Sequence, residues 1–278
     1  MRVAQIWSYP VKSMVGSTIE RGHLDELGLR GDRRWAVRDL DRGGIRGAKK
    51  IGGLMRLEAR LLDGGGAEIM WPDGRRMTTD DPAIDATLGD FLGHNVRLEQ
   101  LPPADDLDHF RRGASDSDDV MAELRAIFGR EENEPLPDLT QFPPVVMEFE
   151  SPPGTHHDCW PLMIMSTSAL RALAEALPDS VIDVKRFRPS LVIDTGEEPG
   201  HPEFGWSGRR FAVGKAEIEI VGPCPRCVMV TRAVGRDLPE DRAVLRHIVR
   251  DLDQNVGMYA TIVRPGSFAA GDAFVALG

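Results

Sequence analysis

The stretch Gly222-Pro-Cys-Pro-Arg-Cys-Val-Met-Val-Thr231 holds two of the three cysteines in the chain and guides the interpretation of the rest. It follows Ala216-Glu-Ile-Glu-Ile-Val221, whose alternating apolar and polar residues predict a β-strand that ends at the Gly-Pro-x-Pro pattern. Proline fixes its own φ angle, so Pro223 and Pro225 predict a stiff loop around Cys224. A stiff loop of this kind suits a metal ligand.

Cys224 and Cys227 form a CxxC pair, with Arg226 directly before the second cysteine. A neighbouring guanidinium favours thiolate over thiol, and thiolates bind zinc, copper(I), iron–sulfur clusters or molybdenum. A zinc site of four cysteines is excluded because the chain has three. The alternative is a pair of inert or redox-active cysteines at the end of a strand, since a lone CxxC is ambiguous.

Segments at both ends of the chain resemble two associated families. The cysteine stretch, together with Asn255-Val-Gly-Met-Tyr-Ala260, Val263-Arg-Pro-Gly266 and Ala270-Gly-Asp272, resembles the MOSC domain, the molybdenum-cofactor-binding module at the C-terminus of molybdenum cofactor sulfurases. Tyr9-Pro-Val-Lys-Ser13 and Gly28-Leu-Arg-Gly-Asp-Arg-Arg-Trp35 resemble the MOSC N-terminal β-barrel domain. That domain precedes MOSC in the mitochondrial amidoxime reducing component and its bacterial relatives.

The expected fold is α+β and β-rich. Short alternating runs between Gly16 and Leu101, separated by Gly-rich turns, predict a barrel or a sandwich. With the resemblance, we expect a MOSC N-terminal β-barrel-like domain over residues 1–103 and a MOSC domain, a β-barrel with flanking helices, over residues 151–278. Residues 104–150 are expected to form an acidic, proline-rich insertion or linker.

The net charge of −10 disfavours nucleic acid and anionic membranes as main partners, because both require a basic face. Three cysteines, no apolar leader and no apolar run near the length of a membrane helix favour a reduced, cytoplasmic setting without a membrane span.

Several elements can be placed along the chain. A strand is expected over Arg2–Trp7, and a helix over Pro82–Leu92 that Gly93 ends. Ser166 is expected to cap a helix that carries Leu170, Leu173 and Leu177, and a further helix is expected over residues 239–254.

Residues 104–134 hold ten acidic residues and four arginines, a net charge of −6. Asp118 is expected to cap a short helix that carries Met121, Leu124 and Phe128 and ends at Gly129. A solvated spacer is the favoured interpretation because segments rich in charge usually face solvent, and a lid is the alternative. We therefore expect that a Gly/Ser linker in place of 104–134 preserves cofactor binding.

The run His156-His-Asp-Cys159 contains four residue types that can bind a metal. Neighbours in an extended segment point to opposite faces, so at most two of them can converge on one ion. Structural histidines are favoured over a metal site here, and Cys159 is expected to be a small buried apolar residue.

Lys185, Arg186 and Arg188 form the densest basic cluster outside the N-terminus, at the end of a predicted strand. It predicts either a phosphate pocket, which arginine binds with two hydrogen bonds, or a solvated basic face. Pro189 is expected to hold Arg188 in an extended conformation. Arg188→Ala is expected to lower cofactor retention more than Lys49→Ala, with Lys49 treated as solvated.

The resemblance implies molybdenum cofactor (Mo-molybdopterin), with no pyridoxal phosphate expected, and it assigns roles to matching residues. Cys227 matches the thiolate that completes molybdenum coordination, so it is the expected catalytic and metal-binding residue. The expected cofactor-binding residues are Lys12, Ser13 and Arg33 at the pterin phosphate, Thr167 and Ser168 at a helix start, Arg188 and Ser190 in the RFRPS run, and Pro225 and Arg226 beside the cysteine. Ser190 replaces the family's asparagine, so a hydroxyl stands where an amide is usual.

Two functions from different classes remain open. The first is a molybdenum-dependent oxidoreductase that reduces small N-hydroxylated compounds. The chain lacks a ferredoxin-type cysteine set, a Rossmann glycine pattern and a haem motif, so its electrons would come from a separate donor protein, ferredoxin-like or a flavin reductase. The second is a non-catalytic carrier of molybdenum cofactor or of sulfur, with a persulfide on Cys224 or Cys227. The N-terminal domain favours the reductase.

Overall fold

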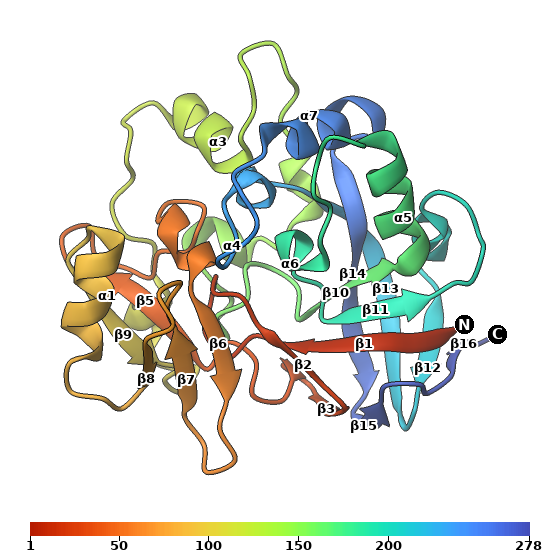
Figure 1. The fold of residues 1–278 in the computed structure, drawn as a ribbon, viewed down its shortest axis with the longest axis horizontal. Helices are drawn as coiled ribbons and strands as arrows, with labels where there is room; N and C mark the ends of the chain where they lie inside the picture. The colour runs from red at the N-terminus through yellow and green to blue at the C-terminus, as the bar shows by residue number, and fades with distance from the viewer.

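An eight-stranded sheet occupies the right-hand part of the molecule in Figure 1. The computed structural model describes all residues 1–278. The order of the strands across the sheet is β16 (Phe274–Ala276), β12 (Arg210–Val213), β13 (Ala216–Pro225), β14 (Asn255–Arg264), β10 (Leu162–Ser166), β11 (Leu191–Asp194), β1 (Arg2–Ser8) and β2 (Ser17–Ile19). Only β10 and β11 run parallel to each other, while the other neighbouring strands are antiparallel.

This sheet curls toward a barrel. An isolated bridge between Arg2 and Ala273 brings β1 back beside β16, and the Val3 amide donates to the Asp272 carbonyl at 2.9 Å. Alternate side chains of the strands point inward and form a cluster of 18 buried apolar residues, among them Ile164 and Phe211. A small sheet of β15 (Gly266–Ala269), β3 (Arg21–Asp25) and β4 (Gly28–Leu29) adds Phe268, Leu24 and Leu29 to this core.

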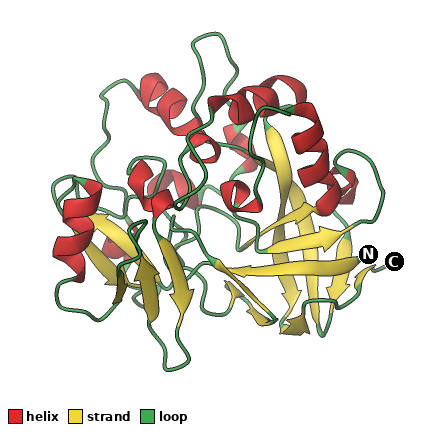
Figure 2. Ribbon diagram, viewed as in Figure 1, coloured by secondary structure: helices red, strands yellow, loops and turns green.

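Helices cover the outer face of the large sheet (Figure 2). Ser166 caps α5 (Thr167–Ala176) as predicted, because its Oγ accepts from the Ala169 amide at 2.9 Å. Asp241 caps α7 (Arg242–Asp251), so that helix is shorter at both ends than the predicted one. Leu173 of α5 and Leu245 of α7 lie in one buried cluster with the outward residues of β10.

The N-terminal part builds a second core from two small sheets and a helix, on the left of Figure 1. The pairs are β5 (Trp35–Asp39) with β9 (Val96–Gln100), and β6 (Glu58–Leu61) with β7 (Ala67–Met70) and β8 (Arg76–Thr78). Helix α1 (Ile84–Leu92) ends at Gly93 with φ 69°, as predicted. Met229 and Val234, from the C-terminal part, complete this core.

The strands of the N-terminal part are not confined to their own sheets. β1 pairs with β11, and β3 pairs with β15, so the first 29 residues contribute strands to sheets whose other strands come from beyond residue 160. The two cores nevertheless remain separate clusters. The α+β, β-rich fold class is therefore confirmed, while the division at residues 103 and 151 stays a prediction.

The middle segment (104–150) carries α2 (Leu107–Phe110), α3 (Val120–Phe128), a 3-10 turn (Leu139–Gln141) and α4 (Val145–Glu148). Asp119, not Asp118, caps α3, because its Oδ1 accepts from the amides of Met121 and Ala122. Most of residues 104–134 are exposed, as the solvated-spacer prediction requires, but Phe110, Arg130 and Glu134 are buried, so the segment is more than a spacer. Fixed packing of these side chains requires the segment to be part of the folded body.

None of the helices is long and apolar enough to cross a membrane.

Candidate functional site

The cysteine motif lies on a strand that is longer than predicted. β13 does not end at Gly222, because pairing with β14 continues through Pro223–Met258 and Pro225–Asn255. Register shifts accommodate the two prolines, which cannot donate to the ladder. The chain leaves the strand at Arg226, and Cys227 stands directly before the short 3-10 helix Val228–Thr231.

A cavity of about 660 Å³ opens beside this motif. Its wall includes all three parts of the chain: Lys12 and Lys49 from the N-terminal part, Leu124 from the middle segment, and Arg188 and Cys227 from the C-terminal part. A volume of this size lies within the range of sites for small molecules and cofactors.

Seven of the ten predicted site residues line the cavity together. They are Lys12, Ser13, Arg33, Arg188, Pro225, Arg226 and Cys227. These residues are far apart in sequence, so their convergence is a product of the tertiary fold.

The other three predicted site residues do not reach the cavity. Thr167 Oγ1 accepts from the Thr195 amide at 3.3 Å, and Ser168 Oγ lies 2.8 Å from Thr195 Oγ1. Ser190 is buried, and its amide donates to the Met163 carbonyl.

The parallel arrangement of β10 and β11 explains where the two hydroxyls of α5 lie. Arg188 and Cys159 precede these strands, whereas Thr167 and Thr195 follow them. The five residues of β10 separate its two ends by about 16 Å. The start of α5 is therefore at the opposite end of the sheet from the cavity.

Three cavity residues have a left-handed backbone, with φ 69° at Ser13, 49° at Arg33 and 59° at Arg188. The extended conformation predicted for Arg188 is wrong, although Pro189 follows it. Such a conformation costs a non-glycine residue about 1–2 kcal/mol and concentrates at functional positions. The guanidinium of Arg188 lies 4.4 Å from the centre of the Tyr9 ring and donates to the Met14 carbonyl, contacts that hold it in place.

The cavity is positively charged in an acidic protein. Nine lysines and arginines line it, against four aspartates and glutamates, which gives a local net charge of +5 in a chain of −10. Burial lowers the pKa of Arg188 to about 10, with a further contribution from the nearby charge of Arg33. No salt bridge joins Arg188 to a carboxylate, so an anionic ligand is the natural counter-charge.

The two cavity lysines differ in how their donors are used. Lys12 is buried, and its Nζ contacts Ser151 Oγ at 3.3 Å, the His156 carbonyl at 2.8 Å and Asp158 Oδ1 at 2.5 Å. An ammonium has three N–H groups, so the donors of Lys12 are fully committed. Lys49 contacts only Asp158, at 2.9 Å, and keeps donors for a ligand.

The prediction that Lys49 is a solvated residue is therefore wrong, because its side chain lines the cavity and pairs with Asp158. Nothing in the Gly47-Ala-Lys-Lys50 stretch distinguishes a cavity lysine from a surface one.

Arg226 contacts Cys224, whereas the sequence predicts an effect on the neighbouring Cys227. Its Nη1 lies 3.1 Å from Cys224 Sγ and its Nη2 donates to the Phe187 carbonyl at 2.8 Å, while its buried Nε has no partner. Cys224 is buried, whereas Cys227 is partly exposed. Cys227 is therefore the most accessible of the three thiols that line the cavity, since Cys159 is buried as well.

In the His156-His-Asp-Cys159 run, His156 has a structural role. His156 Nδ1 lies 3.0 Å from the Arg33 carbonyl and must donate to it, so His156 Nε2 accepts from His109 Nε2 at 2.8 Å. No three His, Cys, Asp or Glu side chains converge in a way that could hold a metal ion. Cys159 is buried, as predicted.

The basic cluster at 185–188 begins on a short helix, α6 (Val184–Phe187), not on a strand. Arg186 is buried and donates to the carbonyls of Val181, Arg232 and Pro239 at 2.8 to 3.1 Å. These carbonyl contacts make Arg186 a structural residue. Lys185 does not line the cavity, so Arg188 is the residue of the cluster left to bind a ligand there.

Two family models match this chain. The "MOSC N-terminal beta barrel domain" matches residues 1–112, and the "MOSC domain" matches residues 153–275. The chain is a MOSC-domain protein. Both domains predicted from the sequence segments are confirmed, and residues 113–152 of this MOSC-domain protein lie outside both matches.

The relatives of this MOSC-domain protein are distant. It is 22% identical to "Mitochondrial amidoxime reducing component 2" of Bos taurus, over 97% of this chain and 81% of that protein. It is 23% identical to "Molybdenum cofactor sulfurase" of Drosophila grimshawi over 89% of this chain, which spans 30% of that longer protein. The solved YUAD protein from Bacillus subtilis aligns over 98% of this chain and 92% of its own, with 10% identity and a TM-score of 0.44.

Proposed function

We propose that this MOSC-domain protein binds molybdenum cofactor and reduces small N-hydroxylated compounds, with electrons from a separate redox protein. The observation that carries the proposal is the cationic cavity beside Cys227, whose partly exposed thiol stands in the wall with Arg188 and Lys49.

The residues of the cavity fit this cofactor. The cofactor carries an anionic phosphate, which the uncommitted donors of Lys49 and the unpaired charge of Arg188 would hold. The buried Nε of Arg226 offers one more donor without a partner in the protein. Cys227 would supply the thiolate ligand to molybdenum. When bound, the cofactor supplies two-electron oxygen-atom transfer.

The protein itself would supply the cavity wall and its positive charge. Residues of the middle segment form part of the cavity wall, while the basic residues raise the local concentration of anions. Similarity to the amidoxime reducing component over 97% of the chain supports the reductase. The chain has no second redox site of its own in sequence, so a separate donor, ferredoxin-like or a flavin reductase, is part of the proposal.

A non-catalytic carrier of the cofactor, or of sulfur on Cys224 or Cys227, is the second candidate. It is favoured by the similarity to molybdenum cofactor sulfurase, of which this chain spans only 30%.

The two are separated by a single-turnover experiment. Protein from a host that makes the cofactor is analysed for molybdenum and for pterin fluorescence, reduced chemically, and mixed with benzamidoxime. A reductase yields benzamidine in proportion to bound molybdenum. A carrier retains the metal and yields none, and a protein without molybdenum or pterin contradicts both functions.

A further inference from the structure

We infer that helix α3 and the residues after it act as a specificity element that selects substrates with an apolar, aromatic body. This rests on the proposed function, because it names the class of N-hydroxylated compound that the same cavity takes.

The apolar face of α3 faces a cavity instead of a core. Val120, Leu124, Ile127 and Phe128 stand at helical positions i, i+4, i+7 and i+8, which lie on one side of a helix. All four line the cavity, and α3 has no buried residue at all. A surface helix normally buries such a stripe against its own protein, so the stripe of α3 is left for a ligand.

Residues after α3 extend the same surface. Phe142 and Met147 also line the cavity, and together with the four residues of α3 we call them the roof. Val120 and Met147 are more than two-thirds exposed, at 69% and 68%. The apolar lining therefore continues from the cavity to the outer surface, where a substrate would enter.

The roof differs in chemistry from the basic part of the cavity wall. Lys49, Arg188 and Arg226 line the cavity with Cys227 and suit the anionic cofactor, while the side chains of the roof offer only carbon and sulfur. A substrate that brings its N–OH group toward Cys227 would place the rest of its body under the roof. Removal of that body from water favours an aryl or alkyl group over a charged one.

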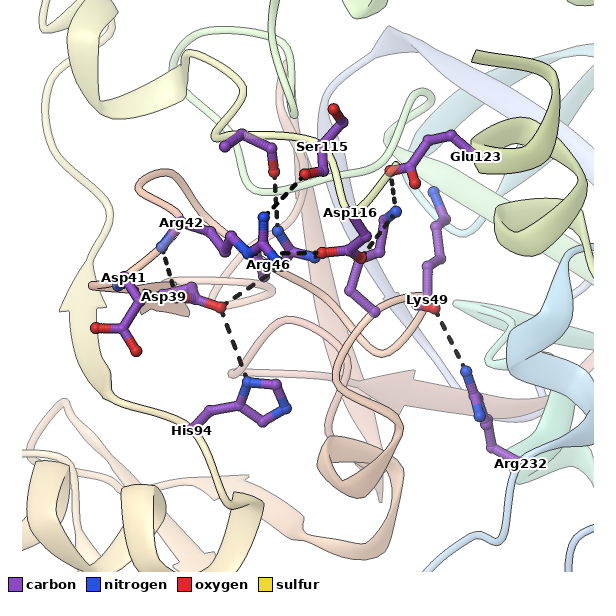
Figure 3. A network of polar contacts seen from close by, with 12 residues as sticks. Asp39, Asp41, Arg42, Arg46, Lys49, His94, Ser115, Asp116, Glu123 and Arg232 are labelled. Atoms are coloured by element: carbon purple, nitrogen blue, oxygen red, sulfur yellow. Dashed lines mark hydrogen bonds and ion pairs between the residues drawn. The ribbon is translucent and has the colours of Figure 1, made fainter. Parts of the chain in front are cut away.

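Polar contacts hold the roof in position on both sides of the cavity. On the N-terminal side, Asp116 lies 2.5 Å from Arg46 (Figure 3). Asp116 also lies 3.1 Å from Lys50, which pairs in addition with Glu123. On the C-terminal side, Arg130 donates to the carbonyl of Arg226, the residue before Cys227, at 3.1 Å. These polar contacts fix the roof through residues other than its apolar side chains.

The test compares two substrates that share the reacting group. Benzamidoxime carries a phenyl group and acetamidoxime a methyl group, and both are reduced with a chemical electron source. Leu124→Gln replaces an apolar roof side chain with a polar one and keeps good helix propensity. We expect KM for benzamidoxime to rise about tenfold, which corresponds to the loss of roughly 1.4 kcal/mol of apolar burial, with acetamidoxime changed less than about twofold.

The matched control is Met121→Gln on the same helix, which is 50% exposed and does not line the cavity. It should leave both substrates unchanged, and the molybdenum content of both variants should equal that of the parent. Ile127→Ala, a smaller change within the roof, should shift benzamidoxime in the same direction if Leu124→Gln does not fold.

Calorimetric binding of benzamidoxime and acetamidoxime to the oxidised protein separates this inference from the proposed function. If neither compound is reduced but benzamidoxime binds more tightly and Leu124→Gln removes that preference, the function fails and the specificity element stands. Equal effects of Leu124→Gln on both substrates, or no effect on either, would overturn the inference even in an active enzyme.

Discussion

Cys224 and Cys227 are three positions apart and have different surroundings. Cys224 is buried beside the guanidinium of Arg226, whereas Cys227 is partly exposed. Cys227→Ala should abolish molybdenum binding and activity with an unchanged melting temperature. Cys224→Ala should keep most molybdenum but lower the free energy of unfolding by about 1–3 kcal/mol, because a buried charged donor loses its partner.

Metal analysis and thermal unfolding of the two variants check this prediction. Equal loss of molybdenum from both, or loss only from Cys224→Ala, would contradict the assignment of Cys227.

Arg188 and Lys49 should both contribute to cofactor retention. Each lines the cavity, and neither has its donors fully used by the protein, so Lys49→Ala is not the solvated control expected from the sequence. Arg242, whose side chain is 85% exposed, is the suitable control. Hydrogen bonds to charged groups contribute about 1.5–3 kcal/mol, so Arg188→Ala should lower retention by about tenfold or more.

Retention is measured as the pterin fluorescence that remains after dialysis. Lys49→Ala should lower it in the same direction and Arg242→Ala should not change it. If all three variants retain the same amount, the contribution of these two residues is only a general effect of charge.

At the scale of elements, α1 and α3 end in the same way and with different consequences. Gly93 has φ 69° and Gly129 has φ 63°, and both leave their helix in the left-handed conformation. An added Cβ at Gly93 meets nothing within 4 Å, whereas at Gly129 it meets Leu245 Cδ2 at 2.7 Å and Val228 Cα at 3.2 Å.

Gly93→Ala should therefore cost about 1–2 kcal/mol of stability from backbone strain alone. Gly129→Ala should cost more and should also displace α3, raising KM for benzamidoxime. Urea unfolding of the two variants gives the comparison, and equal losses of stability would show that the contact of α3 with Val228 and Leu245 is loose.

The middle segment is expected to be necessary for the site. Arg130 contacts Gln254 and the Arg226 carbonyl, and Arg246 pairs with Glu134, so residues 104–134 support the loop that presents Cys227. From the sequence we expect a Gly/Ser linker in place of 104–134 to preserve cofactor binding, whereas from these contacts we expect it to weaken that binding. The deletion should lower both molybdenum content and melting temperature, and a variant with full molybdenum content would refute this.

At the scale of the whole molecule, buried histidines make stability depend on pH. Burial lowers the pKa of His156 to about 3 and lowers that of His157 well below its ordinary value. Between about pH 6.5, the ordinary value, and the folded pKa, the unfolded chain binds more protons than the folded protein. The free energy of unfolding is therefore largest above pH 6.5 and should fall as the pH is lowered through that window.

Urea unfolding at pH 7.5 and 5.5 measures this slope. His156→Gln should reduce the slope as well as the stability, because one of the two neutral histidines is removed. His23→Gln, at an exposed hydrogen bond to Ser267, is the control for the loss of a histidine outside the buried pair. A slope identical in His156→Gln and the parent would place the pH dependence elsewhere.

Local pattern determined much of the chain. Alternation over 216–221 placed β13, the oxygen of Ser166 placed the start of α5, and Gly93 and Gly129 placed the ends of two helices. These features depend on φ angles, side-chain periodicity and capping within a few residues, which a sequence contains directly. Beyond secondary structure, the resemblance of short segments predicted the family and seven of the residues that line the cavity.

Tertiary structure decided what depends on neighbours distant in sequence. Lys49 lines the cavity because Asp158 lies beside it, Arg226 points to Cys224, and Thr167 faces the opposite end of the sheet because β10 and β11 run parallel. Residues 104–134 look solvated by composition, yet the buried Arg130 and Glu134 find partners on other parts of the chain. A charge-rich composition predicts exposure because burying a charged side chain without a partner is unfavourable. The tertiary fold supplies specific partners that offset this cost, and no local pattern shows which residues will have them.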